Sequence, residues 1–452
     1  MDSPAQGADG DGTRRDYHHN QGQQKNSRSN SRTTKVVKSK KRAGGWVNFK
    51  QGGGVDLNPN SANNTTQNAK RSKKNEKTSN HNFGKVMMTI PSPNMSRSDT
   101  LTIALPGSIV NNAQTKELKT YIVGQIARAA SIYHVDEIVV FDDKLGKRSK
   151  TTAGMSNESG SETNPNKNDN LFMARILQYC ECPQYLRRGF FPMSSDLNAA
   201  GVINPIDAPH HVRAGERSTF REGIVLDKKN PSTGNSLVNA GVKKDVEVNM
   251  PLEAGMRVTV EIEDYDAKNI KGTVVSPSEP TLRDGTYWGY QVRVASSITK
   301  IFSECPYPSG YDLKIGTSER GSKSVDDVDF SLPGFKHSLI VFGGVAGIEE
   351  CVDADDECVH VAGEDAETLF DMWLNVCPLQ GSRTIRTEEA VLLTLASLKG
   401  DMRKNTQRRY KEEREVVTKQ REEAKRAEVK KTAKELVAAG DGSELSSESD
   451  SE

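Results

Sequence analysis

Hydrophobic positions around residue 100 follow first a strand period and then a helix period. The run Leu101–Ile109 is rich in β-formers and is ended by Pro-Gly, and residues 113–134 then carry apolar side chains at helical spacing. A compact apolar run at Val135–Asp143 is typical of a strand that is buried on both faces. Strand, helix and strand in this order predict the opening of a parallel α/β sheet.

The pattern changes between residues 202 and 301. The segments Arg257–Tyr265, Lys271–Ser276 and Tyr287–Ser297 alternate polar and apolar residues between turn signals, as antiparallel strands with one solvated face do. We expect a small antiparallel β-barrel inserted in the α/β domain, with an oligonucleotide-binding barrel as the leading candidate. Its aromatic and cationic side chains would either stack bases on an open face or fill the barrel core. They are Tyr287, Trp288, Tyr290 and Arg293.

The α/β pattern returns after residue 301 in three segments that run from apolar residues into loops of small and polar residues: Tyr311–Gly321, His337–Gly347 and Leu369–Leu398. Ligands of open α/β sheets bind beyond the carboxyl ends of the strands, where such loops gather. Glycines and helix N-termini offer backbone groups at close range. The loops therefore predict a cleft that reads an adenine and ribose mostly through backbone contacts. A helix follows the third loop, with Thr387 expected as its N-cap.

Composition marks three further segments. Residues 1–83 contain few branched apolar side chains and cannot repay the entropy of ordering, so we expect a disordered, basic, low-complexity arm. Residues 144–170 form a Gly/Ser/Asn-rich insertion that we also expect to be disordered. Residues 401–452 are dense in Lys, Arg and Glu and predict a charged tail that is helical or disordered.

Charge and cysteine content indicate the cellular compartment of the protein. The net charge of +1 hides a basic N-terminal arm, with Lys and Arg crowded at Lys35–Gly45, and an acidic end at Ser443–Glu452. The six cysteines are scattered and no signal peptide precedes them, so we expect a reducing intracellular compartment. No apolar run approaches the roughly 20 residues that span a bilayer. The basic cluster fits a nuclear-import address, an RNA-attracting arm or a solvated tail, and nuclear residence, otherwise cytoplasmic, is the expectation.

Several other chemistries are disfavoured. The segment Gly343–Gly347 is not a full dinucleotide-binding fingerprint, and no Walker-type phosphate loop is present. Cys180 and Cys182 lack the usual spacing and a second close pair, so no metal site is expected. The adjacent histidines of Pro209–Arg213 are read as a turn at the barrel entrance, in reach of RNA phosphate.

The third-loop segment Leu369–Leu398, together with the two other loop segments and residues 101–143, resembles the SPOUT superfamily of S-adenosylmethionine-dependent methyltransferases. More closely, the chain is similar to the RNA methyltransferase family in which an oligonucleotide-binding-type barrel interrupts the methyltransferase domain. The resemblance covers roughly residues 84–400. It implies a parallel sheet tied in a trefoil knot, with residues 84–201 and 302–400 as the two parts of the methyltransferase domain and 202–301 as the barrel.

The resemblance also implies a cofactor, partners and site residues. The cofactor would be S-adenosyl-L-methionine, the substrate RNA, and the protein a homodimer with the target nucleotide at the subunit interface. Nuclear protein partners are a separate expectation, which rests on the tails outside the resemblance. Arg386 would position the target or stabilise charge, and Glu388 would act as base unless it only caps its helix. The implied cofactor-binding residues are Ser318, Arg320, Gly343, Gly344, Gly347, Asn375, Gly381, Ser382, Thr384, Ile385 and Thr387.

The main alternative is a non-catalytic RNA-binding or scaffold protein of a nuclear assembly that retains the SPOUT fold. Cofactor-binding residues alone do not demonstrate methyl transfer, so this alternative stays open at the level of the sequence.

Overall fold

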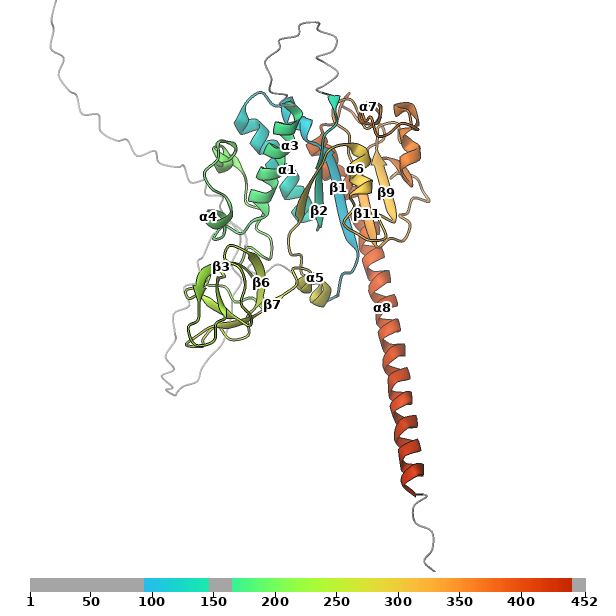
Figure 1. Ribbon diagram of the computed structural model, residues 1–452. Helices are drawn as coiled ribbons and strands as arrows, with labels where there is room; N and C mark the ends of the chain where they lie inside the picture. The colour runs from blue at the N-terminus through green and yellow to red at the C-terminus, as the bar shows by residue number, and fades with distance from the viewer. Residues whose placement is uncertain (1–92, 146–164, 441–452) are drawn as a thin grey trace, which may run out of the picture. The chain divides into compact units, whose positions relative to one another are not determined.

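The computed structural model describes residues 93–145 and 165–440 (Figure 1). The predicted disordered arm at 1–83, residues 146–164 of the predicted insertion and the last residues of the tail lie outside the described residues.

A seven-stranded parallel sheet forms the centre of the α/β domain. Its strand order is β10-β12-β9-β11-β1-β2-β8. The strands are β1 (Thr100–Pro106), β2 (Glu137–Phe141), β8 (Gln291–Ala295), β9 (Leu313–Thr317), β10 (Lys323–Ser324), β11 (His337–Val341) and β12 (Met372–Asn375). Every residue of β2 and β11 is buried, as the continuous apolar run at β2 predicts. The predicted parallel α/β sheet is therefore confirmed.

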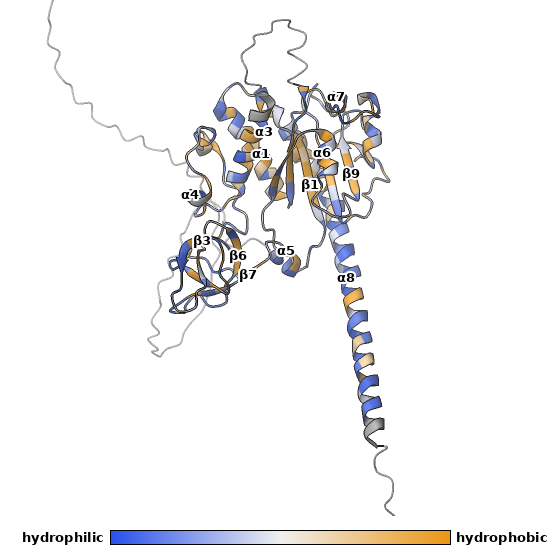
Figure 2. Ribbon diagram, in the orientation of Figure 1, coloured by the Kyte–Doolittle hydropathy of each residue, from blue (hydrophilic) through white to orange (hydrophobic). Residues whose placement is uncertain are grey.

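Helices cover both faces of this sheet. One apolar cluster joins β1 and β2 to α1 (Lys116–Ile132), α3 (Pro165–Glu181) and the first turns of α8 (Thr387–Gly440). A second cluster joins the other face to α6 (Ile298–Ser303) and α7 (Glu349–Asp353). Figure 2 shows the hydrophobic colouring concentrated in the strands and in the helices around them. The remaining helices are α4 (Arg187–Phe190), α5 (Glu279–Asp284) and the 3-10 segments η1 (Gly107–Asn112), η2 (Ser195–Leu197), η3 (Ala200–Val202) and η4 (Gly363–Leu369).

A closed five-stranded barrel is inserted between α3 and β8. Its strands, in the order β3-β4-β5-β7-β6, have a core of their own made of valine, isoleucine and alanine. Their bounds are β3 (Phe220–Lys229), β4 (Ser236–Asn239), β5 (Val246–Val248), β6 (Arg257–Glu261) and β7 (Lys271–Val275). The predicted inserted barrel is confirmed, although one pairing, β5 with β7, is parallel.

The segment Tyr287–Ser297 was expected in the barrel and belongs instead to the large sheet. Its strand β8 pairs in parallel with β2, and Tyr287 and Tyr290 are buried in the core of the α/β domain. For Tyr287 and Tyr290 both readings, base stacking and barrel filling, are therefore wrong, whereas Trp288 is buried beside Phe220 of the barrel strand β3. The physical reason is that β8 is an edge strand and its residues are not all buried, and such a strand alternates polar and apolar residues just as a barrel strand does.

The charged tail continues one long helix rather than starting a separate element. α8 runs without interruption from Thr387 to Gly440, and its middle still packs on the domain. Asn405 is buried and its side chain bonds both backbone polar groups of Phe335, at 3.0 and 3.2 Å. Residues 414–432 are exposed. No helix in the described part of the chain is both long and apolar enough to cross a bilayer.

Candidate active site

Three loops meet at the carboxyl ends of adjacent parallel strands. β12, β9 and β11 are neighbours in the sheet, so the loops that follow them leave it at one edge. They enclose a cavity of about 460 Å³. The predicted residues on its wall are Ser318, Arg320, Gly343, Gly344, Gly347, Asn375, Thr384, Ile385, Arg386 and Thr387. The predicted residues that do not line it are Gly381, Ser382 and Glu388.

The first loop, residues 318–321, is tied by backbone and amide contacts to the end of β12, from which the third loop continues. The Ser318 backbone N–H donates to the Leu374 carbonyl at 3.1 Å, and the Asn375 side-chain amide donates to the Glu319 carbonyl at 2.9 Å. A side chain at Gly321 would collide with the backbone nitrogen of Asn375. The two loops are therefore coupled, and the exposed Arg320 is held at the cavity wall.

The second loop, residues 343–347, uses its three predicted glycines in different ways. A Cβ on Gly343 would lie 2.6 Å from the carbonyl carbon of Gly347, so this position demands close backbone approach. Gly347 has a φ of +83°, which favours glycine, and its N–H donates to the Gly344 carbonyl at 3.2 Å. Gly344 faces open space, because the nearest atom to an added Cβ is Pro106 Cγ at 3.5 Å.

The third loop, residues 376–386, leads into α8, and Thr387 is the first residue of that helix rather than its N-cap. The Thr387 hydroxyl donates to the Gly343 carbonyl at 3.0 Å and so closes the third loop onto the second. The free N–H of Arg386 is instead satisfied by Glu389, whose Oε2 accepts it at 3.0 Å, as the acidic residue of a capping box does. A threonine hydroxyl has one proton to donate, and the loop contact uses it.

Arg386 and Glu388 differ in their access to a ligand. The Arg386 side chain is 60% exposed and lines the cavity, whereas the Glu388 side chain is 7% exposed. Arg386 Nη1 and Glu388 Oε1 are 3.9 Å apart, at the limit of an ion pair. Glu388 Oε2 is buried and makes no hydrogen bond within the described residues. Since Glu389 takes the capping position, capping does not account for Glu388.

Among the lining residues that the sequence reasoning missed are Glu349 and Asn112. Glu349, the first residue of α7, brings a carboxylate to the wall, where Ser318 Oγ lies 3.4 Å from its Oε1. Glu349 comes two residues after the glycine loop in the chain, and this position could have indicated that it belongs to the site. Asn112 comes from η1, far away in sequence, and no local pattern indicated it.

The composition of the cavity fits S-adenosylmethionine. Its volume lies in the range of about 300–1,000 Å³ that is usual for small-molecule sites. Arg320, Arg383 and Arg386 offer guanidinium groups to a carboxylate, and Glu349 offers acceptors to ribose hydroxyls. Gly343 and Gly344 expose backbone groups to an adenine. These residues would hold the cofactor.

Two motifs set apart in the sequence lie elsewhere. His210 is fully buried, and its Nε2 lies 2.9 Å from the Glu181 carbonyl, so the expected contact of this histidine with RNA phosphate is wrong. Burial raises the pKa of Cys180 and of Cys182 to about 12. Among residues 93–145 and 165–440, no group of three or more His, Cys, Asp or Glu side chains is arranged to hold a metal ion.

Comparison with known proteins now identifies the class. The family model described as "Putative RNA methyltransferase" matches residues 100–398. The 28S rRNA (uridine-N(3))-methyltransferase of Mus musculus is 51% identical over 308 residues, which are 68% of this chain and 77% of that protein. The protein of the same name from Homo sapiens is 51% identical over 305 residues, 67% of this chain and 78% of that protein.

A solved structure was also matched, at much lower similarity. The SpoU methyltransferase AviRb from Streptomyces viridochromogenes, in complex with AdoMet, is 10% identical and covers 68% of this chain and 59% of that chain. Its TM-score is 0.24, which is too low to support an argument.

The chain belongs to this family of RNA methyltransferases. It is a SPOUT-class enzyme that transfers a methyl group to RNA, and S-adenosylmethionine is its methyl donor.

Proposed function

We propose that this enzyme methylates N3 of a uridine in the RNA of the large ribosomal subunit. The observation that carries the proposal is the 51% identity to 28S rRNA (uridine-N(3))-methyltransferases, together with the family match over residues 100–398, which include all three loops of the cavity. The proposed cofactor-binding residues are those of the three loops. Gly381 and Ser382 do not line the cavity, and their proposed role is indirect. Ser382 Oγ donates to the Thr384 carbonyl at 2.9 Å and so shapes the third loop.

Methyl transfer to uridine N3 places two demands on the chain. S-adenosylmethionine, when bound, supplies a methyl group on a positively charged sulfur. N3 forms a bond to that carbon while the carbon–sulfur bond breaks, S-adenosylhomocysteine leaves, and the N3 proton must pass to a base. Negative charge meanwhile develops on the neighbouring uracil oxygens. An enzyme has to stabilise that charge and remove the proton.

Arg386 is proposed to stabilise the developing charge, and Glu388 is proposed to accept the proton. The exposed Arg386 guanidinium, at the cavity wall, would meet the uracil oxygen where charge develops. Glu388 carries a buried carboxylate oxygen that has no hydrogen-bond donor within the described residues, and it lies beside Arg386. We assign it the role of proton acceptor.

A homodimer with the target nucleotide at the subunit interface belongs to the same proposal. Support comes from apolar side chains that are exposed around the third loop and the start of α8: Val345 is 84% exposed, Leu379 103%, Leu392 45% and Leu393 37%. Exposed apolar side chains gathered in this way are typical of association surfaces. The trefoil knot is proposed with it, the Thr387–Gly343 contact between the third and second loops being compatible with a threaded chain.

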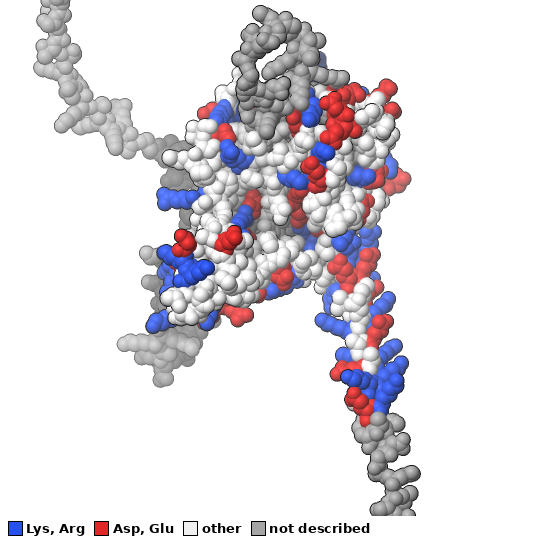
Figure 3. All heavy atoms as spheres, viewed as in Figure 1, with Lys and Arg blue, Asp and Glu red and all other residues white. Residues whose placement is uncertain are grey.

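The barrel and the tails would supply contacts to RNA and partners. Figure 3 shows Lys and Arg side chains on the barrel, and the exposed lysines of two adjoining barrel loops include Lys243, Lys244 and Lys268. Such cations give affinity without sequence choice and weaken with salt. A nuclear location, with protein partners reached through the tails, fits a ribosomal RNA substrate.

The test is transfer of a labelled methyl group from S-adenosylmethionine to large-subunit RNA, with the parent beside Arg386→Ala. Transfer by the parent, reduced by about a hundredfold or more in the variant, is the expected result. A parent that binds S-adenosylhomocysteine and RNA but transfers nothing would favour the alternative, a non-catalytic RNA-binding scaffold.

A further inference from the structure

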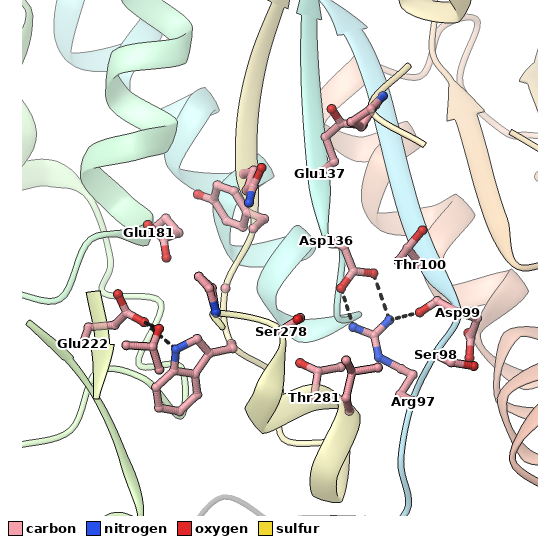
Figure 4. A pocket seen from close by; sticks show the side chains of 18 of the residues that line it. Arg97, Ser98, Asp99, Thr100, Asp136, Glu137, Glu181, Glu222, Ser278 and Thr281 are labelled. Atoms are coloured by element: carbon pink, nitrogen blue, oxygen red, sulfur yellow. Dashed lines mark hydrogen bonds and ion pairs between the residues drawn. The ribbon is translucent and has the colours of Figure 1, made fainter. Parts of the chain in front are cut away.

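The barrel and the methyltransferase domain have separate apolar cores. The barrel cluster consists of barrel residues alone among the described residues, and the two clusters of the other domain contain none of its strands. A cavity of about 480 Å³ lies between β6 and the amino-terminal ends of β1 and β2 (Figure 4). The two bodies therefore share no common core, and apolar side chains meet between them at single contacts such as that of the Phe220 and Trp288 rings, whose centroids are 6.0 Å apart.

Polar contacts cross this junction, and Arg257 of β6 makes two of them. Its Nη1 and Nη2 bond the two carboxylate oxygens of Glu181 at 2.6 and 2.8 Å, and Glu181 ends helix α3 of the methyltransferase domain. Its Nε bonds Glu222 Oε2 at 2.7 Å, on the neighbouring barrel strand β3. One guanidinium thus links the two bodies with a bidentate geometry that resists rotation.

The segment that leads from the barrel back into the large sheet also contacts Glu181 and Glu222, through Trp288 and Gly289. Trp288 Nε1 donates to Glu222 Oε1 at 2.5 Å, as drawn in Figure 4. Gly289 follows with a φ of +88°, and a Cβ there would lie 2.5 Å from Glu181 Oε1. His210 Nε2 lies 3.1 Å from the same oxygen. Glu181 is therefore enclosed by groups from the barrel, from the barrel entrance and from the return segment.

The cluster is buried enough to be rigid. The side chains of Glu181 and Glu222 are 8% and 4% exposed, and that of Arg257 is 33% exposed. Burial alone would raise the pKa of Glu181, but hydrogen bonds from Arg257 and His210 lower it to about 2, so the carboxylate is charged at neutral pH. A buried charge is costly to separate from the partners that compensate it.

We propose that Arg257 is a positioning residue that sets the orientation of the barrel relative to the cofactor cavity, and so delivers bound RNA to the reacting methyl group. This inference rests on the proposed function, because it assigns the barrel to RNA. Arg257 lies outside the three loops of the cofactor cavity, so its effect is expected on RNA and not on the cofactor.

The test compares Arg257→Lys with Arg217→Lys. Lysine keeps the charge but loses the bidentate fork. Arg217 is the matched control, since it bonds Asp266 at 2.7 Å on the exposed surface of the barrel region, with both side chains more than 60% exposed. We expect kcat/KM for RNA to fall about tenfold or more in Arg257→Lys, because small misplacements are costly in catalysis. S-adenosylhomocysteine affinity should stay within about twofold in both variants, and Arg217→Lys should keep kcat/KM within about twofold.

Hydrogen exchange followed by mass spectrometry measures the stability of the junction between barrel and methyltransferase domain independently of methyl transfer. In Arg257→Lys, peptides over residues 178–190 and 284–291 should exchange faster, while the barrel strands keep their protection. Glu181→Gln, combined with Arg257→Lys, should add little to the single change, because both break one contact. Unchanged exchange and unchanged kcat/KM would overturn the proposal, and so would equal loss of cofactor binding, which indicates general unfolding. A parent without methyl transfer refutes the proposed function instead, and the exchange data still decide whether Arg257 holds the junction.

Discussion

Replacing Gly343 by alanine should damage the cofactor site far more than the same change at the adjacent Gly344. The added Cβ at Gly343 would lie 2.6 Å from the carbonyl carbon of Gly347, 2.7 Å from Ile348 N and 2.8 Å from Gly347 Cα. Carbon atoms in contact are normally about 3.5–4.0 Å apart, so the loop must open by about 1 Å. All three neighbours are backbone atoms, which no side-chain rotation can move aside.

Opening the loop strains two hydrogen bonds, from Gly347 N to the Gly344 carbonyl at 3.2 Å and from Thr387 Oγ1 to the Gly343 carbonyl at 3.0 Å. At about 0.5–1.5 kcal/mol each, their loss amounts to about 1–3 kcal/mol. Because about 1.4 kcal/mol corresponds to a tenfold change in affinity, S-adenosylhomocysteine should bind roughly 5- to 150-fold more weakly.

Calorimetric titration with S-adenosylhomocysteine measures this difference, with the fold checked by thermal unfolding. Gly344→Ala is the control, since its Cβ would meet Pro106 Cγ at an ordinary 3.5 Å, and its affinity should stay within about threefold of the parent. Equal affinities of the two folded variants would refute the assignment of the second loop to the cofactor.

Four further changes test other parts of the account. Arg386→Ala should lower kcat, measured by steady-state kinetics, by about a hundredfold, with a much smaller change in S-adenosylhomocysteine affinity. The kcat of Arg386→Lys should lie between those of the parent and Arg386→Ala. Thr387→Val should cost about 1–3 kcal/mol of unfolding free energy by removing the bond to Gly343, whereas Thr387→Ser should retain it in urea titration. The lowered pKa of Glu181 stabilises the folded state fully above about pH 4.5, and about 3 kcal/mol is lost as the pH falls from there towards 2, so Glu181→Gln should flatten the acid limb of stability. Ending the chain after residue 413 should change stability by less than about 1 kcal/mol, since the residues beyond are exposed, while ending it before Asn405 should be strongly destabilising because the bonds to Phe335 are lost.

The sheet and the three-loop cavity could be predicted because their signals are local. A strand buried on both faces has an unbroken apolar run, as β2 does, and glycine-rich loops directly follow the strands β9 and β11. Parallel strands then bring such loops to one edge, so the site follows from the topology. Ten of the implied site residues do line one cavity.

The features that were not predicted depend on contacts between residues far apart in the sequence. The alternation in β8 is the same whether its neighbour is a barrel strand or β2, and only the pairing decides. Thr387 was predicted as an N-cap, but the helix already includes it, and the partner of its hydroxyl, the Gly343 carbonyl, is far away in the sequence. Arg257 reads as a surface cation at the start of a strand until Glu181, from another domain, meets it. Local pattern carries no information about such contacts.

Nucleoside mass spectrometry of large-subunit RNA, incubated with the purified enzyme and S-adenosylmethionine, tests the central claim most directly. The account predicts the appearance of uridine methylated at N3, dependent on the enzyme and greatly reduced with Arg386→Ala. Methylation at another atom would contradict the assigned target. No methylation by a folded protein that binds S-adenosylhomocysteine and this RNA would contradict the proposed reaction itself.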